Sequence, residues 1–437
     1  MNNNILKLLK IKDENIKIIN VEENVEVKNG KLATTIHAVL TYKPKACQRC
    51  GVVNEGQIQK HGKKESRITL PKMSECDTYL FLLKQRFKCN NCSKTFVAMT
   101  NIVNENCFIS NRSYDAIIHK LTSVRSEKSI SESCAVSPST VHRHIFKVGE
   151  TFQMNSDTKL PRHIAMDEFK SVKNSEGSMS FLFIDADTHN VIDIVENRQM
   201  RNLKAYFSRY SLKERKKVKT VSIDMYEPYM HLILEVFPNA RIIIDRYHIV
   251  QAANRELNRY RIQLMNSMRH SDGKTYRKLK RFWKLFLMNP DFLNAFHYKR
   301  FPLFKSLMTS NGILEFLLNL DPKLRETYKV VHQLRYALKI NDLKSFNDIV
   351  NNVEKRDISA GLYRIVRTFK KYQQYISNTF EYKHYTNGPI EGINNKIKLI
   401  KRTSYGYTNF VKLKYRTLII FRLYKRTGAL DDTYKTA

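Results

Sequence analysis

The sequence predicts a mixed α/β fold, because short apolar strands and helices alternate through its middle part. Three strands come first, at "RHIAMD", "MSFLFIDAD" and "NVIDIVEN". The turn residues Thr188, His189 and Asn190 between the last two predict a hairpin. The chain then continues as a helix at "MRNLKAYFSRY", a strand at "KTVSID", a helix at "EPYMHLILEVF" and a strand at "ARIIID".

This order of elements is that of an RNase H-like mixed sheet, which carries ligands at its strand ends. Asp167 ends the first strand and Asp224 ends the fourth. Because these two strands are neighbours in such a sheet, we expect their carboxylates to converge. For either residue alone, the alternative is a helix N-cap or a turn position, which is common for aspartate after a strand. This alternative fits four other residues better, and the last of them can cap the next helix: Asp185, Asp187, Asp193 and Asp245.

The charge balance indicates an anionic partner. The 437 residues include 76 Lys and Arg against 41 Asp and Glu, a net charge of +35, so nucleic acid is the first candidate. A membrane surface is the alternative, but we find neither a basic amphipathic helix standing alone nor an apolar run that could span a bilayer. The start, "MNNNILKLLKIKDENIKIIN", lacks the features of a signal peptide, so we expect a cytoplasmic protein without a membrane partner.

Two CxxC pairs predict a structural zinc site. Cys47 with Cys50 and Cys89 with Cys92 each have the spacing that lets two sulfurs face one tetrahedral ion. We expect one Zn²⁺ bound by all four, with the second pair at a hairpin tip as in a zinc ribbon. The 38 residues between the pairs exceed a compact ribbon, and four unrelated thiols are the alternative. Three cysteines have no partner at ligand spacing and are expected to serve in packing: Cys76, Cys107 and Cys134.

The stretch "EKSISESCAVSPSTVHRHIFKV" predicts a helix-turn-helix. Ser137 can cap the second helix, and Pro138 can open it, because the missing N–H of proline costs nothing there. The apolar contacts are assigned to Ile130, Cys134, Val141 and Ile145, with Val136 in the turn. The residues expected to face a DNA groove are Ser139, His142, Arg143 and Lys147. The alternative is a plain helical hairpin, since the motif is short and degenerate.

A third acid begins the helix predicted for "PIEGINNKIKLIKR", residues 389–402. At about 100° per residue, one face is apolar and carries Ile390, Ile393, Ile397 and Ile400. The opposite face is polar and carries Glu391, Asn395, Lys398 and Arg402. A surface glutamate in an ordinary helix ion pair is the alternative for Glu391. The preceding "TNGP" favours a special position, because it fixes the start of the helix.

The sequence resembles the bacterial insertion-sequence transposases of the DDE class, in the group called ISL-three. The matching segments follow in family order from about Cys47 to Arg422, and the last is long and specific. They are "CQRCG", "KQRFKCNNCSKTF", "SPSTVHR", "IAMDEFK", "VSIDMYEPY", "IIIDRYHIV" and "NGPIEGINNKIKLIKRTSYGYTNF".

The resemblance implies that Asp167, Asp224 and Glu391 are the acidic triad of the RNase H-like catalytic domain. Two Mg²⁺ ions held by these carboxylates would activate the attacking oxygen and stabilise the leaving one. The reaction implied is hydrolysis at the transposon end, followed by attack of the freed 3′-OH on target DNA. Lys398 and Arg402 would steady the DNA backbone. The long segment between Asp224 and Glu391 corresponds to a helical insertion.

The same segments give expectations for several neighbouring residues. We expect Glu168 to point to the other face of its strand from Asp167. Trp283 is expected in the core of an amphipathic helix, rather than stacking on a flipped base as an insertion aromatic does in distantly similar transposases. Three residues flank the active strands and either contact DNA or pack: Tyr226, Tyr229 and His248.

The expected architecture is an RNase H-like mixed sheet interrupted by a long helical insertion and preceded by two DNA-recognition modules. The expected bounds are 1–107 for the zinc-ribbon-like module, 108–155 for the helix-turn-helix, 160–250 for the first part of the catalytic core, 251–385 for the insertion and 386–426 for the last helix of the core and the C-terminal region. We expect double-stranded DNA, both transposon ends and target, as the partner of a nucleoid-associated homo-oligomer that is at least a dimer when synapsed. The alternatives are a non-catalytic DNA-binding regulator and a structure-selective nuclease.

Overall fold

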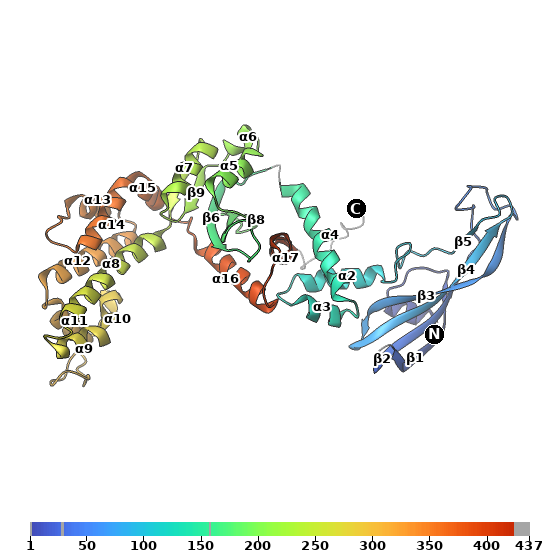
Figure 1. The fold of residues 1–437 in the computed structure, drawn as a ribbon, viewed down its shortest axis with the longest axis horizontal. Helices are drawn as coiled ribbons and strands as arrows, with labels where there is room; N and C mark the ends of the chain where they lie inside the picture. Colours follow the sequence, from blue (N-terminus) through green and yellow to red (C-terminus); the bar gives the residue numbers. More distant parts are fainter. Residues whose placement is uncertain (1, 28–29, 157–158, 424–437) are drawn as a thin grey trace. The chain divides into compact units, whose positions relative to one another are not determined.

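The computed structural model describes residues 2–27, 30–156 and 159–423 (Figure 1). Its internal contacts divide the chain into two compact units. The first comprises residues 1–155, 172–174 and 396–437, and the second comprises residues 156–171 and 175–395. Residues 424–426, the last of the expected C-terminal region, lie outside the described residues.

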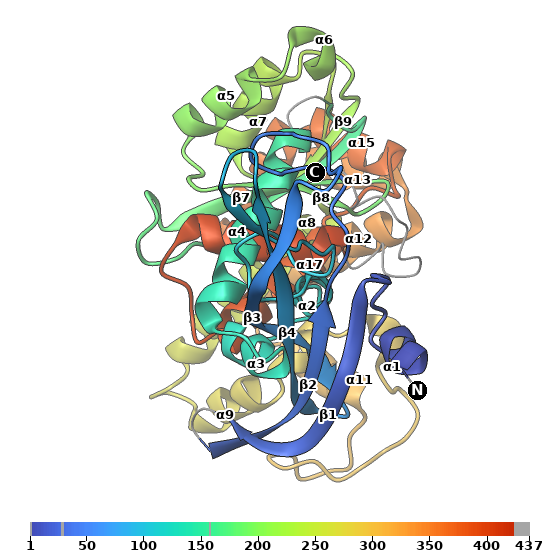
Figure 2. The same cartoon turned by 90° about the vertical axis from the view of Figure 1, so that its right-hand side faces the viewer.

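A five-stranded sheet and one short helix begin the first unit. Their bounds are α1 Asn2–Leu8, β1 Ile16–Val27, β2 Lys31–Leu40, β3 Ile58–Met73, β4 Cys76–Cys89 and β5 Thr95–Val97. The strand order is β1-β2-β4-β3, with β5 paired to β4 alone, and Figure 2 shows β1 to β4 side by side. Only β2 and β4 pair in parallel. Alternate apolar residues of these strands form a separate buried core.

The long β3–β4 hairpin explains the distance in sequence between the two CxxC pairs. Ser74 and Glu75 join the strands and both have positive φ, as a tight two-residue hairpin requires. The register pairs Ile58, at the start of β3, with Cys89, at the end of β4. The hairpin therefore carries the chain away from the first CxxC pair and back toward it, so the two pairs lie at the same end of the hairpin although they are far apart in sequence.

Four helices form the second part of the first unit: α2 Asn111–Leu121, α3 Glu127–Ser133, α4 Pro138–Ser156 and α17 Phe410–Leu423. Helices α3 and α4, joined by a turn that contains Ala135 with φ 53°, are the helix-turn-helix. The side chain of Ser137 accepts a hydrogen bond from the Thr140 N–H, as predicted for the start of α4. The four residues predicted to pack, Ile130, Cys134, Val141 and Ile145, are buried.

Helix α17 packs against α2, α3 and α4, although the sequence grouped its residues with the catalytic core. Tyr415 and Ile419 of α17 belong to the same buried cluster as the helix-turn-helix residues. Gly149 of α4 makes the close crossing possible, because a Cβ there would lie 2.1 Å from the Tyr415 ring. Arg416 is 1% exposed and donates hydrogen bonds to the backbone oxygens of Leu121, the last residue of α2, and of Ser123 and Arg125 in the segment between α2 and α3.

The second unit contains the predicted mixed sheet. Its strands are β6 His163–Lys170, β7 Met179–Asp185, β8 Val191–Val195, β9 Thr220–Ile223 and β10 Arg241–Ile244. The order is β10-β9-β6-β7-β8, with β6, β7 and β8 antiparallel and β6, β9 and β10 parallel. This order confirms the RNase H-like arrangement predicted from the sequence. The connecting helices are α5 Met200–Ser208, α6 Leu212–Arg215 and α7 Glu227–Val236, of which the short α6 was not predicted.

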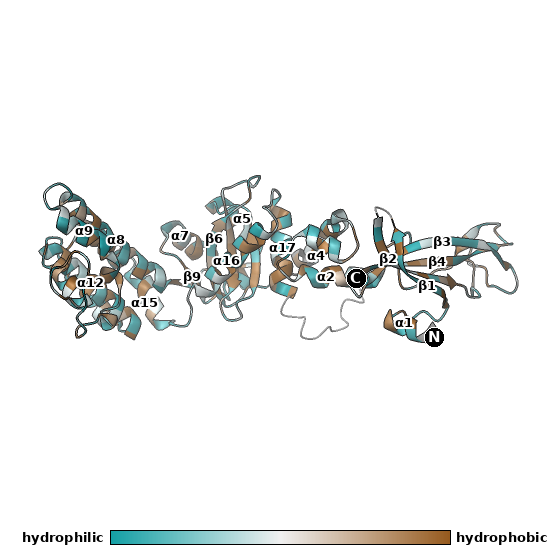
Figure 3. Cartoon of the chain, turned by 90° about the horizontal axis from the view of Figure 1, so that it is seen from below, coloured by the Kyte–Doolittle hydropathy of each residue, from teal (hydrophilic) through white to brown (hydrophobic). Residues whose placement is uncertain are grey.

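The rest of the second unit is helical. The bounds are α8 Arg246–Ser267, α9 Gly273–Arg281, α10 Trp283–Leu287, η2 Pro290–Phe292, α11 Ser310–Leu318, α12 Pro322–Ile340, α13 Leu343–Asn352, α14 Ala360–Lys371, α15 Gln373–Glu381 and α16 Gly388–Thr403. Residues 396–403, the second half of α16, are counted with the first unit. One buried apolar cluster joins the sheet to helices α8 to α15. Figure 3 shows hydrophilic and hydrophobic residues mixed along these helices. Within the described ranges no helix has the length and apolar character needed to cross a membrane.

Helix α15 covers the edge strand β10. The hydroxyl of Thr379 donates to the backbone oxygen of Ile244 at 2.7 Å and accepts from its N–H at 3.2 Å. The Asn378 amide donates to the backbone oxygen of Ile242 at 2.8 Å. These bonds satisfy polar groups that an edge strand otherwise exposes, and they hold the sheet firmly to the insertion helices.

Candidate active site and zinc centre

The register of β6 and β9 brings Asp167 and Asp224 to the same edge of the sheet. In this parallel pair, Ala165 of β6 lies opposite Ser222 of β9. Each aspartate follows its member of that pair by two residues. The sequence placed Asp167 at the end of its strand, but β6 continues to Lys170 by pairing with β7 alone. The two carboxylates therefore lie where the β6–β9 pairing ends.

The Asp167 carboxylate is held by hydrogen bonds and by burial. One oxygen accepts from the Glu168 backbone N–H at 2.7 Å, and the other accepts from the Asn394 amide at 2.6 Å. Burial raises the pKa of Asp167 to about 6, and repulsion by the Asp224 carboxylate adds to this rise. A perturbed acid next to a second acid is typical of a functional site.

The Asp224 carboxylate contacts a histidine on the first turn of α8. His248 Nε2 lies 2.9 Å from Asp224 Oδ1, and this hydrogen bond raises the pKa of His248. Asp245 occupies the N-cap position of α8, as predicted, but its side chain makes no capping hydrogen bond. Its carboxylate instead accepts from the Asn387 backbone N–H at 3.1 Å. Asp245 thus links the end of β10 to the start of α16.

Two asparagines, which the sequence did not single out, attach α16 to the aspartate pair. The Asn387 amide donates to Asp224 Oδ1 at 3.1 Å, and the Asn394 amide is the donor to Asp167. Glu391 lies between them in sequence and three residues before Asn394. Because residues three apart share one side of a helix, Glu391 lies on the same side of α16 as Asn394. Its side chain is exposed. The predicted apolar face of α16 is buried: Ile390, Ile393, Ile397 and Ile400.

The donor set around the aspartates suits a hard, hydrated cation such as Mg²⁺. All the candidate ligands are oxygens, which Mg²⁺ prefers, and the amide oxygens of Asn387 and Asn394 are buried without a hydrogen-bond partner among the described residues. Among the described residues, the carboxylate oxygens of Asp167, Asp224 and Glu391 are not all within 4.8 Å of one another, so the three acids do not form a closed ligand group. The structure brings Asp167 and Asp224 together in one cavity, whose lining does not include Glu391.

A cleft of about 330 Å³ opens at this edge of the sheet. Its lining includes both aspartates and the side chains of Glu168, Arg198, Tyr226, Tyr229, His248 and Arg255. Glu168 lines the same cleft but meets other elements than Asp167, which bonds Asn394 of α16, so the two neighbours point to different faces of β6 as expected. The Glu168 carboxylate accepts hydrogen bonds from Arg198 and, at 2.9 Å, from the Tyr229 hydroxyl, and these partners turn the long side chain toward the cleft.

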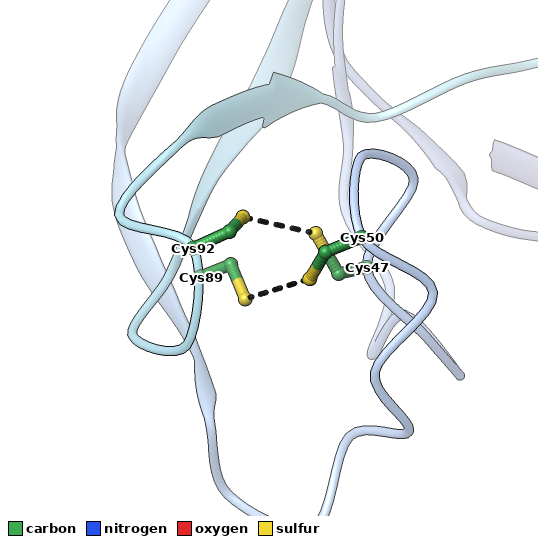
Figure 4. Close-up of side chains that lie close together, drawn as sticks. All are labelled: Cys47, Cys50, Cys89 and Cys92. Carbon is green, nitrogen blue, oxygen red and sulfur yellow. Dashed lines mark hydrogen bonds between the residues drawn. The ribbon is translucent and has the colours of Figure 1, made fainter.

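The four predicted zinc ligands converge in the first unit. Cys89 ends β4 and Cys92 lies in the turn to β5, while Cys47 and Cys50 lie in the loop between β2 and β3 (Figure 4). The Cys47–Cys92 and Cys50–Cys89 sulfurs are each 3.8 Å apart. This is the only such ligand group within the described ranges. The arrangement confirms the predicted four-cysteine cluster at a hairpin tip.

The backbone of the first cysteine loop favours the thiolate form. The Val52 N–H, with help from the Asn91 amide, lowers the pKa of Cys50 to about 6. The Arg49 N–H lies 3.4 Å from the Cys47 sulfur. Of the cysteines expected to pack, Cys134 is buried, Cys107 is partly buried and Cys76 is exposed. The expectation is wrong for Cys76, because it begins β4 at the solvent-exposed end of the β3–β4 hairpin.

The predicted DNA-facing residues lie mostly on exposed surfaces. Ser139, Arg143 and Lys147 of α4 are exposed. His142 is half-buried, with Nδ1 3.7 Å from the Glu127 carboxylate, so this residue has a structural contact besides any contact with DNA. On α16, the outward positions Lys398 and Arg402 are exposed.

Trp283 was expected in the core, and this expectation is wrong. The side chain is 38% exposed at the first position of α10, and the core position of this short helix is taken by Phe286, which is fully buried.

Comparison with known families gives two matches that together cover most of the chain. Residues 164–417 match the DDE transposases of the ISL3 group. Residues 43–92 match the zinc-finger of transposases IS204, IS1001, IS1096 and IS1165. The first match covers the sheet, the insertion and α16, and the second contains all four clustered cysteines.

Two curated proteins are similar to parts of the chain. The transposase for insertion sequence element IS1001 of Bordetella parapertussis is 28% identical over 262 residues, which are 58% of this chain and 60% of that protein. A protein named ATP-dependent protease from Lactococcus lactis subsp. lactis is 36% identical over 113 residues, which are 26% of this chain and 35% of that protein. The chain thus spans three fifths of the length of the transposase and about a third of the length of the second relative.

Proposed function

Because the chain belongs to the DDE transposase family of the ISL3 group, we propose that it binds the ends of an insertion sequence and catalyses Mg²⁺-dependent DNA strand cleavage and strand transfer. The observation that carries this proposal is the pair Asp167 and Asp224 at level positions of two parallel strands, with α16 hydrogen-bonded to both. An acidic cleft is unusual in a chain of net charge +35, and a phosphoryl-transfer site explains it.

In this proposal, Asp167, Asp224 and Glu391 hold two Mg²⁺ ions, which supply activation of the attacking oxygen and charge stabilisation at the leaving oxygen. The aspartates are fixed by hydrogen bonds to α16 and to the β6 backbone. Glu391, on the first turn of α16, remains exposed and can turn toward them. His248 holds Asp224 in one orientation through its 2.9 Å contact.

Basic residues of the cleft are suited to the DNA backbone. Arg198 and Arg255 line the cleft together with the aspartates, and guanidinium groups bind phosphate oxygens in pairs. Arg198 is paired with Glu168. The two charges offset one another, and the guanidinium lies close to where a scissile phosphate would bind.

The first unit supplies end recognition in this proposal. One Zn²⁺ held by the four cysteines fixes the ribbon, and α4 presents its exposed Ser139, Arg143 and Lys147, with His142 beside them, to the major groove. Lys398 and Arg402 add charge for the DNA backbone. The domain bounds given by the sequence are retained as part of the proposal, except that α17 is grouped with the helix-turn-helix, against which it packs. Two ends are brought together by at least a dimer, which acts on DNA in the nucleoid.

The test is a cleavage and strand-transfer assay on a duplex that contains the transposon end. Asp167→Asn and Asp224→Asn keep side-chain shape and remove one charged ligand each, so both activities should fall by about three orders of magnitude or more. DNA binding should be retained, because neither change removes a positive group. Full activity of both variants would refute the proposal. Binding without any cleavage by the wild type would indicate a regulator, and cleavage without joining would indicate a nuclease.

A further inference from the structure

Two buried asparagines of the α16 segment have the same unusual pattern of hydrogen bonds. Asn387 is 5% exposed and Asn394 is 6% exposed. Each amide nitrogen donates to a candidate metal-ligating aspartate, and each amide oxygen is buried without a partner among the described residues. Building on the proposed function, we propose that these asparagines are positioning residues that orient the two aspartates and accept hydrogen bonds from metal-bound water.

The donor side of each amide connects three elements. Asn394 Nδ2 lies 2.6 Å from Asp167 Oδ2 and 3.4 Å from the backbone oxygen of Glu168. Asn387 Nδ2 lies 3.1 Å from Asp224 Oδ1 and 3.5 Å from the backbone oxygen of Met166. Both amides therefore join a carboxylate and the β6 backbone to α16. Rotation of either carboxylate breaks a hydrogen bond to a charged acceptor, which is stronger than a neutral one.

The acceptor side of each amide is incomplete in the protein alone. A buried polar atom without a hydrogen bond is destabilising, so it is uncommon unless a ligand or water completes it. Mg²⁺ keeps several of its water molecules when carboxylates bind it. Those waters are donors only, and an amide oxygen beside the ligating aspartate is the matching acceptor. The two amide oxygens without a partner thus fit the water shell of a hydrated cation.

This arrangement predicts a specific effect on metal affinity. Groups that orient metal ligands contribute about 10- to 100-fold to metal affinity in other proteins. Asn394→Leu removes both the donor to Asp167 and the free acceptor while keeping similar volume, and Asn387→Leu does the same at Asp224. Each variant should bind the metal about 10- to 100-fold more weakly, without direct loss of a ligand.

The experiment is a Mn²⁺ titration of the zinc-loaded, full-length protein without DNA, followed by electron paramagnetic resonance of free Mn²⁺. Asn347→Leu is the matched control, because the Asn347 amide oxygen is also buried without a partner but lies on α13, outside the cleft. Melting temperatures without Mn²⁺ verify that each variant is folded. If a leucine variant does not fold, Asn387→Ser and Asn394→Ser replace it.

Weaker Mn²⁺ binding by the Asn387 and Asn394 variants, with wild-type binding by the Asn347 control, supports the inference. Cleavage by these variants should also need more Mg²⁺ for half-maximal rate and recover at saturating Mg²⁺, which a packing defect would not produce. Affinities within twofold of wild type, or an equal loss in the control, would overturn it. Asp167→Asn separates the two proposals: if it binds Mn²⁺ as wild type does, the proposed metal site itself fails.

Discussion

The four-cysteine cluster gives a metal–ligand distance that can be measured. In a regular tetrahedron the distance between two ligands is about 1.63 times the metal–ligand distance, so the sulfur separations of 3.8 Å give Zn–S bonds of about 2.3 Å, the value usual for zinc thiolate. Purified protein should contain one zinc per chain, and X-ray absorption should show four sulfur neighbours at that distance.

Replacing Cys89 tests the same centre. Cys89→Ser should remove zinc, and the loops around Cys47 and Cys92 should then exchange backbone hydrogens faster, because the metal joins them. The β1–β4 sheet has its own buried core, with Ile36 and Leu80 fully enclosed, so its exchange should change less. Binding to the transposon end should weaken. Cys76→Ser, at an exposed position, is the matched control. Full zinc content in Cys89→Ser, or a coordination shell with fewer than three sulfurs in wild type, would refute this account.

Three further predictions concern the rest of the chain. Arg143→Ala should weaken binding to the transposon end more than binding to random DNA, measured by competition at fixed salt, because α4 is assigned to base-edge recognition. Arg416→Met should lower the free energy of unfolding by about 3 kcal/mol in denaturant titration, since it removes three hydrogen bonds from a buried guanidinium. Burial lowers the pKa of His332 from 6.5 to about 4 in the folded protein. Between these pH values, His332 therefore carries a proton in the unfolded chain but not in the folded one. Stability should therefore rise with pH from about 4 to 6.5, and His332→Gln should flatten that part of the melting-temperature profile.

Local patterns in the sequence predicted much of the fold, the four clustered cysteines and the two aspartates that share one edge of the sheet. The strand and helix order identified the sheet, and the alternation on α16 identified its buried face with Ile390 and Ile397 at 0% exposure. The CxxC spacing identified the four thiols. Each of these depends on interactions between residues close in sequence or on one repeated pattern, and such information is present in a single sequence.

Features that depend on which surfaces meet were not predicted. Every residue of α17 from Leu413 to Ile420 is buried, and the local sequence does not show that the helix-turn-helix supplies part of this cover. Arg416 looked like one more basic residue among many, and only its three backbone acceptors show a structural role. Asn387 and Asn394 flank Glu391 in "NGPIEGINN", and their spacing was a usable signal. Their partners on β6 and after β9 lie more than 160 residues earlier in the chain, which no local pattern can reveal.

The central claim is that Glu391 completes one metal-dependent active site with Asp167 and Asp224. The most direct measurement is the rate of Mg²⁺-dependent nicking of an end-containing duplex by Glu391→Gln. Glu381→Gln is the control, since Glu381 ends α15 and pairs with Arg241 outside the cleft. The account predicts nicking reduced by several orders of magnitude in Glu391→Gln, with DNA binding retained and the control unchanged. Nicking by Glu391→Gln at the wild-type rate would contradict it and place the third ligand elsewhere.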